Sequence, residues 1–297
     1  MKIKLLRLGI VILLIWAVSS ISALAQGGEI RESLTFNSDL LNKDVEYSIY
    51  LPAAYEATNR NYPVLYLLHG FSDDETGWTQ FGQVKKIADK LADNVDVSDM
   101  IIVMPDAGVS WYINSSDGQT MYEDFFVEEF IPMIDEEYRT RGSKEFRAVA
   151  GLSMGGYGTM IMALKHPDLF SAAAPLSAGI LTNKEIIDMP QENWENVFAV
   201  PFGKGLEGKD RLTDHYQQNS ILQLIETGNA DSLNSVSYYI DCGDDDFLIK
   251  GNMELHSRMI DKDIDHEFQV RDGGHTWEYW RTALPEVLKF VSQSFHR

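Results

Sequence analysis

The segment Gly151-Leu152-Ser153-Met154-Gly155 constrains the fold of this chain more than any other feature of its sequence. It follows a short apolar run at residues 147–150 and precedes a helix-like stretch at residues 155–165. In the G-x-S-x-G pattern, small residues allow a tight turn from strand to helix, and the serine hydroxyl stays exposed above the edge of a sheet. The motif alone occurs by chance in glycine-rich chains. Its position between strand and helix makes Ser153 a candidate nucleophile.

Apolar runs that predict strands alternate along the chain with stretches of helical periodicity. Strands are expected at residues 45–51, 64–68, 101–104, 147–150, 172–176, 237–241 and 266–270. Helices are expected at residues 83–92, 155–165, 253–260 and 277–294, and the aromatic pattern of residues 122–138 predicts another, kinked at Pro132. Strands that alternate with helices favour an α/β fold, with a mostly parallel sheet covered by helices on both faces.

Residues 179–234 interrupt this alternation, because they contain several glycines and large aromatic residues but no clean strand. We expect an insertion within a single domain of residues 26–297, since no linker, repeat or low-complexity tract divides the chain. The insertion is expected near the mouth of the site that contains Ser153. The alternative is a peripheral helical excursion unrelated to substrate.

The first 25 residues have the layout of a secretory signal peptide. Three cationic residues precede an apolar run at residues 8–18, and the segment ends in Ala23-Leu24-Ala25, which predicts cleavage after Ala25. A transmembrane anchor is the alternative, but the apolar run is short for a bilayer. The mature protein is therefore expected to be secreted or periplasmic, with no stable membrane anchor.

The charge and cysteine content narrow the choice of partners and stabilising bonds. A formal charge of −20 disfavours binding to nucleic acid and to anionic membranes, and a neutral substrate fits better. Cys242 is the only cysteine, so no intrachain disulfide can form. Because no helix start or second base accompanies Cys242, we interpret it as a small buried hydrophobic residue rather than a nucleophile.

A serine hydroxyl is a poor nucleophile by itself, so a base must reach it. In proteins with this motif the partners follow the serine in the order acid, then histidine. Of seven histidines, only His275 lies in a loop expected between a strand and a helix, and the two glycines before it let the backbone bring the ring to Ser153. His256, by contrast, falls within a predicted helix.

The acid is expected at the end of the strand before His275, where Asp241, Asp244, Asp245 and Asp246 cluster. Its role is to orient the imidazole and to stabilise the imidazolium. Calcium binding is the alternative for this cluster, but calcium needs six or more oxygens at defined loop positions and the spacing does not match. The two apolar residues after Asp246 are expected to bury it beside the histidine loop, which favours Asp246.

The oxyanion that forms during attack needs backbone N–H donors. One is expected at Met154, directly after the candidate nucleophile. The second is expected in the loop that follows the strand at residues 64–68. There the strand runs directly into His69-Gly70, so the amide of Phe71 can point into the site.

Four segments resemble the esterase D group of the α/β-hydrolase superfamily. They are YPVLYLLHG at residues 62–70, GLSMGGYG at residues 151–158, HPDLF at residues 166–170 and GGH at residues 273–275. The group contains feruloyl and acetylxylan esterases of carbohydrate esterase family 1, tributyrin-type esterases, S-formylglutathione hydrolases and mycolyltransferases. The resemblance spans residues 47–290, almost the whole mature chain.

This resemblance implies an α/β-hydrolase fold, a catalytic triad of Ser153, Asp246 and His275, and oxyanion-hole amides at Phe71 and Met154. It also implies that Trp78 and Trp111 line the substrate cleft, although aromatic residues in loops can equally be packing residues. No cofactor and no metal are expected.

The expected activity is carboxylic ester hydrolysis, through an acyl-enzyme, of feruloyl or acetyl esters on plant polysaccharide or its fragments. The enzymatic alternatives are S-formylglutathione hydrolysis, short-chain acyl ester hydrolysis and acyl transfer to a sugar hydroxyl. The predicted signal peptide disfavours the first of these, since S-formylglutathione is cytosolic. A carbohydrate-binding relative without activity is the alternative of a different class.

Overall fold

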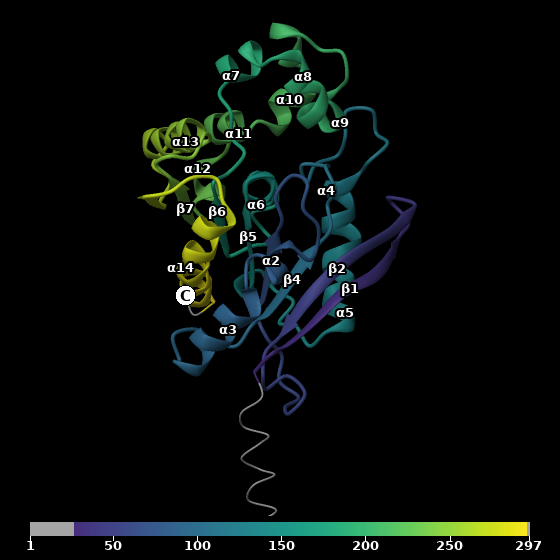
Figure 1. The fold of residues 1–297 in the computed structure, drawn as a ribbon, viewed down its shortest axis with the longest axis vertical. Helices are drawn as coiled ribbons and strands as arrows, with labels where there is room; N and C mark the ends of the chain where they lie inside the picture. Colours follow the sequence, from purple (N-terminus) through teal and green to yellow (C-terminus); the bar gives the residue numbers. More distant parts are fainter. Residues whose placement is uncertain (1–26, 296–297) are drawn as a thin grey trace, which may run out of the picture.

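Eight strands form one sheet in the order β1-β2-β4-β3-β5-β6-β7-β8 in the computed structural model, which describes residues 27–295 (Figure 1). β1 and β2 are antiparallel to their neighbours, and all the other strands run parallel. The predicted α/β-hydrolase fold is therefore confirmed. The strands are β1 (Glu29–Ser38), β2 (Lys43–Leu51), β3 (Val64–Leu68), β4 (Ile101–Pro105), β5 (Arg147–Leu152), β6 (Ala172–Leu176), β7 (Ser237–Gly243) and β8 (Glu267–Arg271).

The central strands read as continuous apolar runs because both of their faces are buried. In β3, Tyr66 and Leu68 face one hydrophobic core, whereas Leu65 and Leu67 face the other. β1 was missed by the sequence analysis. It is a largely exposed edge strand with a β-bulge between Arg31 and Leu34, so it lacks the apolar run that marks the buried strands.

Helices cover both faces of the sheet. α3 (Val84–Asp93) and α14 (Trp277–Ser294) lie on one face, and α6 (Met154–Lys165) and α13 (Ile249–Asp261) lie on the other (Figure 1). Eleven of the twelve residues of α6 are buried, which explains why this helix has no polar face. No helix within residues 27–295 is long and apolar enough to cross a membrane, and the predicted signal peptide lies outside the described residues.

The predicted aromatic helix is present in three parts. α4 (Tyr122–Asp124) leads into a π-helical segment (Phe125–Phe130), which continues as α5 (Ile131–Glu137). Pro132 lies in the first turn of α5, directly after the π-helical segment. The missing proline N–H therefore falls where the regular hydrogen-bond pattern is already interrupted.

Residues 179–234 form short helices, of which those at residues 183–219 gather at one end of the molecule, whereas those at residues 221–233 lie beside α13 (Figure 1). Buried Arg211 holds the first group together by donating hydrogen bonds to the carbonyls of Ile186, Met189 and Leu206. The elements of residues 179–234 are α7 (Asn183–Asp188), α8 (Gln191–Asn193), a π-helical turn (Trp194–Phe198), α9 (Ala199–Phe202), a 3₁₀ turn (Gly208–Arg211), α10 (Asp214–Asn219), α11 (Ile221–Thr227) and α12 (Ala230–Leu233).

The insertion is fastened to α6 and to the serine turn. The Tyr157 hydroxyl and Lys165 Nζ both donate to Asn219 of α10. At the start of the insertion, the Gly179 N–H donates to the carbonyl of Ser153 over 2.8 Å. These contacts place the start of the insertion against the turn that carries Ser153.

We expect Gly155→Ala to lower the free energy of unfolding by about 1–3 kcal/mol, because α6 begins in contact with the end of β3. A Cβ at residue 155 would lie 2.5 Å from the carbonyl oxygen of Leu68 and 2.6 Å from that of His69, and backbone atoms there cannot move aside. Urea and thermal unfolding measure the loss. Gly274→Ala is the control, since its Cβ would meet nothing closer than 3.6 Å, and its change should stay within about 0.5 kcal/mol. Equal losses would contradict this account.

Candidate active site

Ser153 lies at the turn between β5 and α6 with a strained backbone, φ 55° and ψ −115°. Hydrogen bonds hold it in that conformation. The Ser153 N–H donates to the Leu176 carbonyl over 2.9 Å, and the Ser153 carbonyl accepts from Gly179 and Tyr157. A conformation of this kind costs about 1–3 kcal/mol and persists only where the surrounding structure enforces it.

His275 connects the candidate nucleophile to the candidate acid. Its Nε2 lies 2.9 Å from Ser153 Oγ, and its Nδ1 lies 2.9 Å from Asp246 Oδ2. The ring is held between two aromatic neighbours, with Phe247 at 4.6 Å and Trp280 at 4.8 Å between ring centroids. The structure thus brings together the three residues that the resemblance grouped, in the geometry that nucleophilic catalysis requires.

The Asp246 side chain is fully buried, whereas that of His275 keeps 19% exposure. Burial by itself would raise the pKa of Asp246, but hydrogen bonds from His275 and from the Leu248 amide outweigh it and hold the pKa below its usual range. Asp246 is therefore a carboxylate at neutral pH, which is the form that orients and stabilises an imidazolium.

The other three aspartates of this stretch have different surroundings. Asp241 is buried and accepts hydrogen bonds from Arg271, Tyr279 and Tyr239, so all of its partners are structural. Asp244 and Asp245 are exposed. The choice of Asp246 assumed that both following residues bury it, and this is wrong for Phe247, which is 71% exposed; Leu248 alone is buried.

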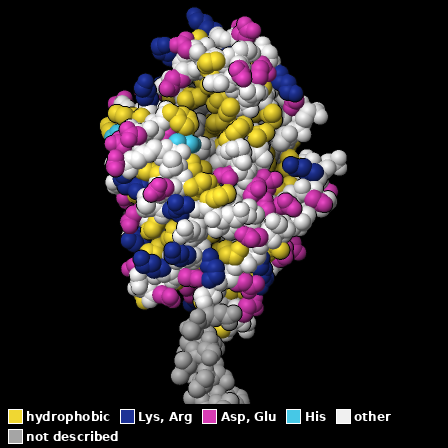
Figure 2. Space-filling model, viewed as in Figure 1, with side chains coloured by type: hydrophobic (Ala, Val, Ile, Leu, Met, Phe, Trp, Pro, Cys, Tyr) yellow, Lys and Arg dark blue, Asp and Glu magenta, His cyan; other side chains and the backbone are white. Residues whose placement is uncertain are grey.

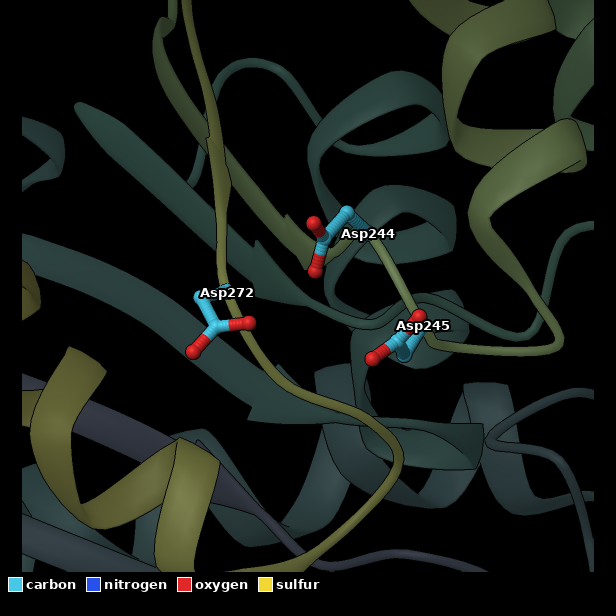
Figure 3. Close-up of side chains that lie close together, drawn as sticks. All are labelled: Asp244, Asp245 and Asp272. Carbon is cyan, nitrogen blue, oxygen red and sulfur yellow. The ribbon is translucent and has the colours of Figure 1, made fainter.

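Asp244 and Asp245 lie close to Asp272, which comes from the loop after β8 (Figure 3). The ligand oxygens of the three carboxylates lie within 4.8 Å of one another. All three side chains are exposed, and Asp244 also accepts a hydrogen bond from the Gly273 amide. Three exposed carboxylates are fewer than the six to eight oxygen ligands that calcium takes, and we assign no metal to them.

Two backbone amides lie close to Ser153 along the chain or in space. The Met154 N–H belongs to the first residue of α6, and Phe71 follows Gly70 in the loop after β3. A Cβ added to Gly70 would lie 3.5 Å from Ser153 Cβ, so this loop touches the nucleophile turn. Within residues 27–295, neither amide donates to a protein acceptor, which leaves both able to bind an oxyanion.

The two tryptophans expected to line the cleft are buried. Trp78 is fully buried, its indole N–H donates to the Leu68 carbonyl, and its ring packs against Trp277 at 5.2 Å. In this structure it is a packing residue, which corrects the expectation that Trp78 faces substrate. The reason is that Trp78 lies in the short helix α2 (Gly77–Gln80), where its ring belongs to the hydrophobic core that α14 covers.

Trp111 is 5% exposed and lies between the serine turn and the insertion. Its indole N–H donates to the Val197 carbonyl, and its ring packs against Phe198 at 4.7 Å and Tyr157 at 5.2 Å. A Cβ added to Gly179 would lie 2.7 Å from the Trp111 ring and 3.3 Å from the Ser153 carbonyl oxygen. Substrate contact by Trp111 therefore stays a prediction.

Two residues that the sequence analysis did not identify, Ser177 and Trp280, hold His275 in place. Ser177 is buried with φ 44°, and its hydroxyl accepts a hydrogen bond from the Trp280 indole N–H. Trp280 in turn packs edge-on against His275. The spacing between residues 177 and 280 gives no sign of this contact, because only the tertiary fold brings the end of β6 to the first turn of α14.

Cys242 is fully buried, as expected. Burial raises the pKa of its thiol to about 12, with Asp246 as a second cause. A thiol with that pKa stays protonated at neutral pH, so Cys242 does not compete with Ser153 as a nucleophile.

A comparison with known protein families decides the class of this site. The model of the Esterase family matches residues 38–291, which is most of the chain. The chain belongs to the Esterase family. It is therefore an enzyme that hydrolyses ester bonds, and its serine turn lies within the matched region.

Individual proteins that are similar to this chain are also named as esterases. A solved ferulic acid esterase is 34% identical and superimposes with a TM-score of 0.77, covering 91% of this chain and 99% of its own. The acetyl esterase of Caldicellulosiruptor saccharolyticus is 23% identical over 275 residues, which cover 88% of this chain and 97% of that protein. The endo-1,4-beta-xylanase/feruloyl esterase of Xylanibacter ruminicola is 34% identical over 164 residues, 53% of this chain, and the matched segment spans 23% of that longer protein.

Asp246 is expected to be the aspartate on which the esterase activity depends. Asp246→Asn should lower kcat for p-nitrophenyl acetate by about two to four orders of magnitude, because the amide cannot stabilise the imidazolium. Asp244→Asn and Asp245→Asn are matched controls in the same loop. The kcat of both should stay within about tenfold of wild type, since both side chains are exposed. In Asp244→Asn the asparagine oxygen can still accept the Gly273 N–H. A crippling effect of Asp245→Asn with a mild effect of Asp246→Asn would contradict this assignment.

Proposed function

We propose that this esterase is a secreted or periplasmic serine enzyme that removes feruloyl or acetyl groups from plant polysaccharide or its fragments. The proposed serine chemistry rests on one observation, the two 2.9 Å hydrogen bonds that connect Ser153 through His275 to Asp246. The substrate class is supported by the ferulic acid esterase that superimposes on almost the whole chain. Secretion is supported by the signal-peptide pattern of residues 1–25.

The proposed reaction passes through an acyl-enzyme. Ser153 Oγ attacks the ester carbonyl while His275 Nε2 accepts its proton, and the imidazolium is stabilised by ionised Asp246. The amides of Met154 and Phe71 stabilise the oxyanion. His275 then protonates the leaving alcohol, and a water activated by the same ring releases the acid and restores Ser153.

The surroundings of the triad suit a substrate with an apolar ring. On the face of the molecule that Figure 2 shows, hydrophobic side chains gather below the helices of the insertion. Exposed Phe247 lies against His275, and exposed Phe81 is linked to His275 through the packed rings of Trp277 and Trp280. Aromatic faces of this kind bind aryl groups and the apolar faces of sugars alike, which fits an aryl ester on a carbohydrate.

Ser153→Ala is expected to lower kcat by at least about 10⁴-fold while unfolding at nearly the same temperature, because one hydroxyl at a turn contributes little to stability. The assay uses p-nitrophenyl acetate, with circular dichroism to confirm folding. Residual turnover close to wild type would move the nucleophile elsewhere. Complete inertness of folded wild-type protein would instead favour a binding protein without activity.

A panel of substrates tests the proposed specificity. Mature protein is assayed on methyl ferulate, acetylated xylan, a short triglyceride and S-formylglutathione, and kcat/KM is compared, since that ratio reports differential stabilisation of the transition state. Methyl ferulate or acetylated xylan should rank first. S-formylglutathione in first place would overturn the proposal, and acylated sugars formed when sugar acceptors are added would show a transferase.

Trp111→Ala is expected to reduce kcat/KM for methyl ferulate more than for p-nitrophenyl acetate, because the small acetyl group does not reach an aromatic wall. Trp111→Phe keeps an apolar ring beside Gly179 and serves as the control, with a smaller loss on methyl ferulate. Equal losses on both esters, together with a lower unfolding temperature, would show that Trp111 only packs the insertion against α6.

A further inference from the structure

We propose that His69 is a positioning residue that aims the Phe71 amide at the oxyanion, acting through the carbonyl of Gly70. This inference deepens the proposed function and rests on it. His69 touches neither substrate nor Ser153 in the proposed reaction. Its side chain is 1% exposed and lies directly behind the loop that ends β3.

Both ring nitrogens of His69 have backbone partners, and these partners fix the tautomer. Nδ1 lies 2.8 Å from the carbonyl oxygen of Gly70, which can only accept, so Nδ1 carries a hydrogen. Nε2 lies 2.8 Å from the Ala107 N–H, which can only donate, so Nε2 accepts. Asp106 Oδ1 is farther from Nε2, at 3.5 Å, and accepts a hydrogen bond from the Gly108 amide instead. His69 thus donates to Gly70 through Nδ1 and accepts from Ala107 through Nε2.

The hydrogen bond to Gly70 controls the direction of the next amide. Within residues 27–295 every peptide bond is trans, so the Gly70 carbonyl and the Phe71 N–H belong to one plane and point in opposite directions. Holding the carbonyl on the His69 ring and on the Asp73 amide, at 3.2 Å, therefore turns the Phe71 N–H the other way. Glycine rotates freely about its backbone bonds, so this peptide needs such a restraint to keep one orientation.

The two oxyanion donors differ in what holds them. The Met154 amide begins α6, and the packing of that helix on β3 and β6 sets its direction. The Phe71 amide lies in a loop outside any helix or strand. Its direction depends on the Gly70 carbonyl, and the strongest restraint on that carbonyl is the buried ring of His69.

His69 is itself held by the loop that follows β4. The Tyr112 hydroxyl donates to the His69 carbonyl over 3.0 Å, and Tyr112 is fully buried. Ala107, whose amide anchors the ring, lies in the loop directly after β4. The loops after β3 and β4 are therefore locked together through His69, and the oxyanion amide takes its direction from that junction.

Two substitutions separate the proposed hydrogen bond from the remaining roles of the ring. In His69→Asn the side-chain amide nitrogen takes the place of Nδ1 and can still donate to Gly70. In His69→Gln the amide reaches the place of Nε2, where its oxygen accepts from Ala107, but nothing donates to Gly70. Both variants lose ring packing, so they are matched in what they remove from the core.

We expect His69→Gln to lower kcat for p-nitrophenyl acetate by about 10²–10³-fold with KM within about threefold, as removal of an oxyanion donor does. His69→Asn should retain kcat within about tenfold of wild type. Inhibition by phenylboronic acid, whose adduct with Ser153 mimics the tetrahedral intermediate, should weaken in His69→Gln by about the same factor as kcat/KM. Leu65→Ala, which opens a cavity in the same strand away from the site, controls for lost stability and should leave kcat of the folded enzyme unchanged.

Equal activity of the two His69 variants, or a loss that Leu65→Ala reproduces at the same unfolding temperature, would overturn the positioning role. If the wild type is active in either of these cases, the proposed function still stands and only the role of His69 is overturned. A wild type that hydrolyses no ester overturns the proposed function and the role of His69 together.

Discussion

The strained backbone of Ser153 is the constraint on which the rest of the site depends. A non-glycine residue at φ 55° and ψ −115° is held there by the Leu176 carbonyl on one side and the Gly179 and Tyr157 amides on the other. Those partners come from the end of β6, the start of the insertion and α6. The serine hydroxyl is therefore presented above the sheet only when three separate parts of the fold are in place.

A second constraint brings the acid and the base to the same edge of the sheet. The loops after β7 and β8 approach so closely that a Cβ at Gly243 would lie 2.0 Å from the Gly273 carbonyl oxygen. Beneath them, buried Asp241 accepts hydrogen bonds from Arg271 of β8 and Tyr279 of α14. This network fixes the two loops relative to each other, so the 2.9 Å contact between His275 and Asp246 is a property of the sheet edge rather than of either loop alone.

Trp111 connects the insertion to the turn that carries Ser153. Trp111 joins the loop after β4 to the π-helical turn at Val197 and lies against Gly179, which also binds the Ser153 carbonyl. A change in the insertion therefore reaches the nucleophile turn through one aromatic ring. By contrast, Phe247 is exposed beside His275, so replacing it should have little effect on the fold.

The sequence by itself determined the α/β alternation, the position of Ser153 and the choice of His275, because buried parallel strands are apolar without interruption and a strand-glycine-serine-glycine-helix turn has few solutions. It missed β1, whose exposed edge position needs no apolar run. Only the tertiary structure decided the surroundings of the chosen residues. Trp78 turned into the core, and Ser177 met Trp280 across more than a hundred residues. Such contacts depend on where the sheet brings distant loops together. Local periodicity reports only the structure of neighbouring residues, so it cannot reveal them.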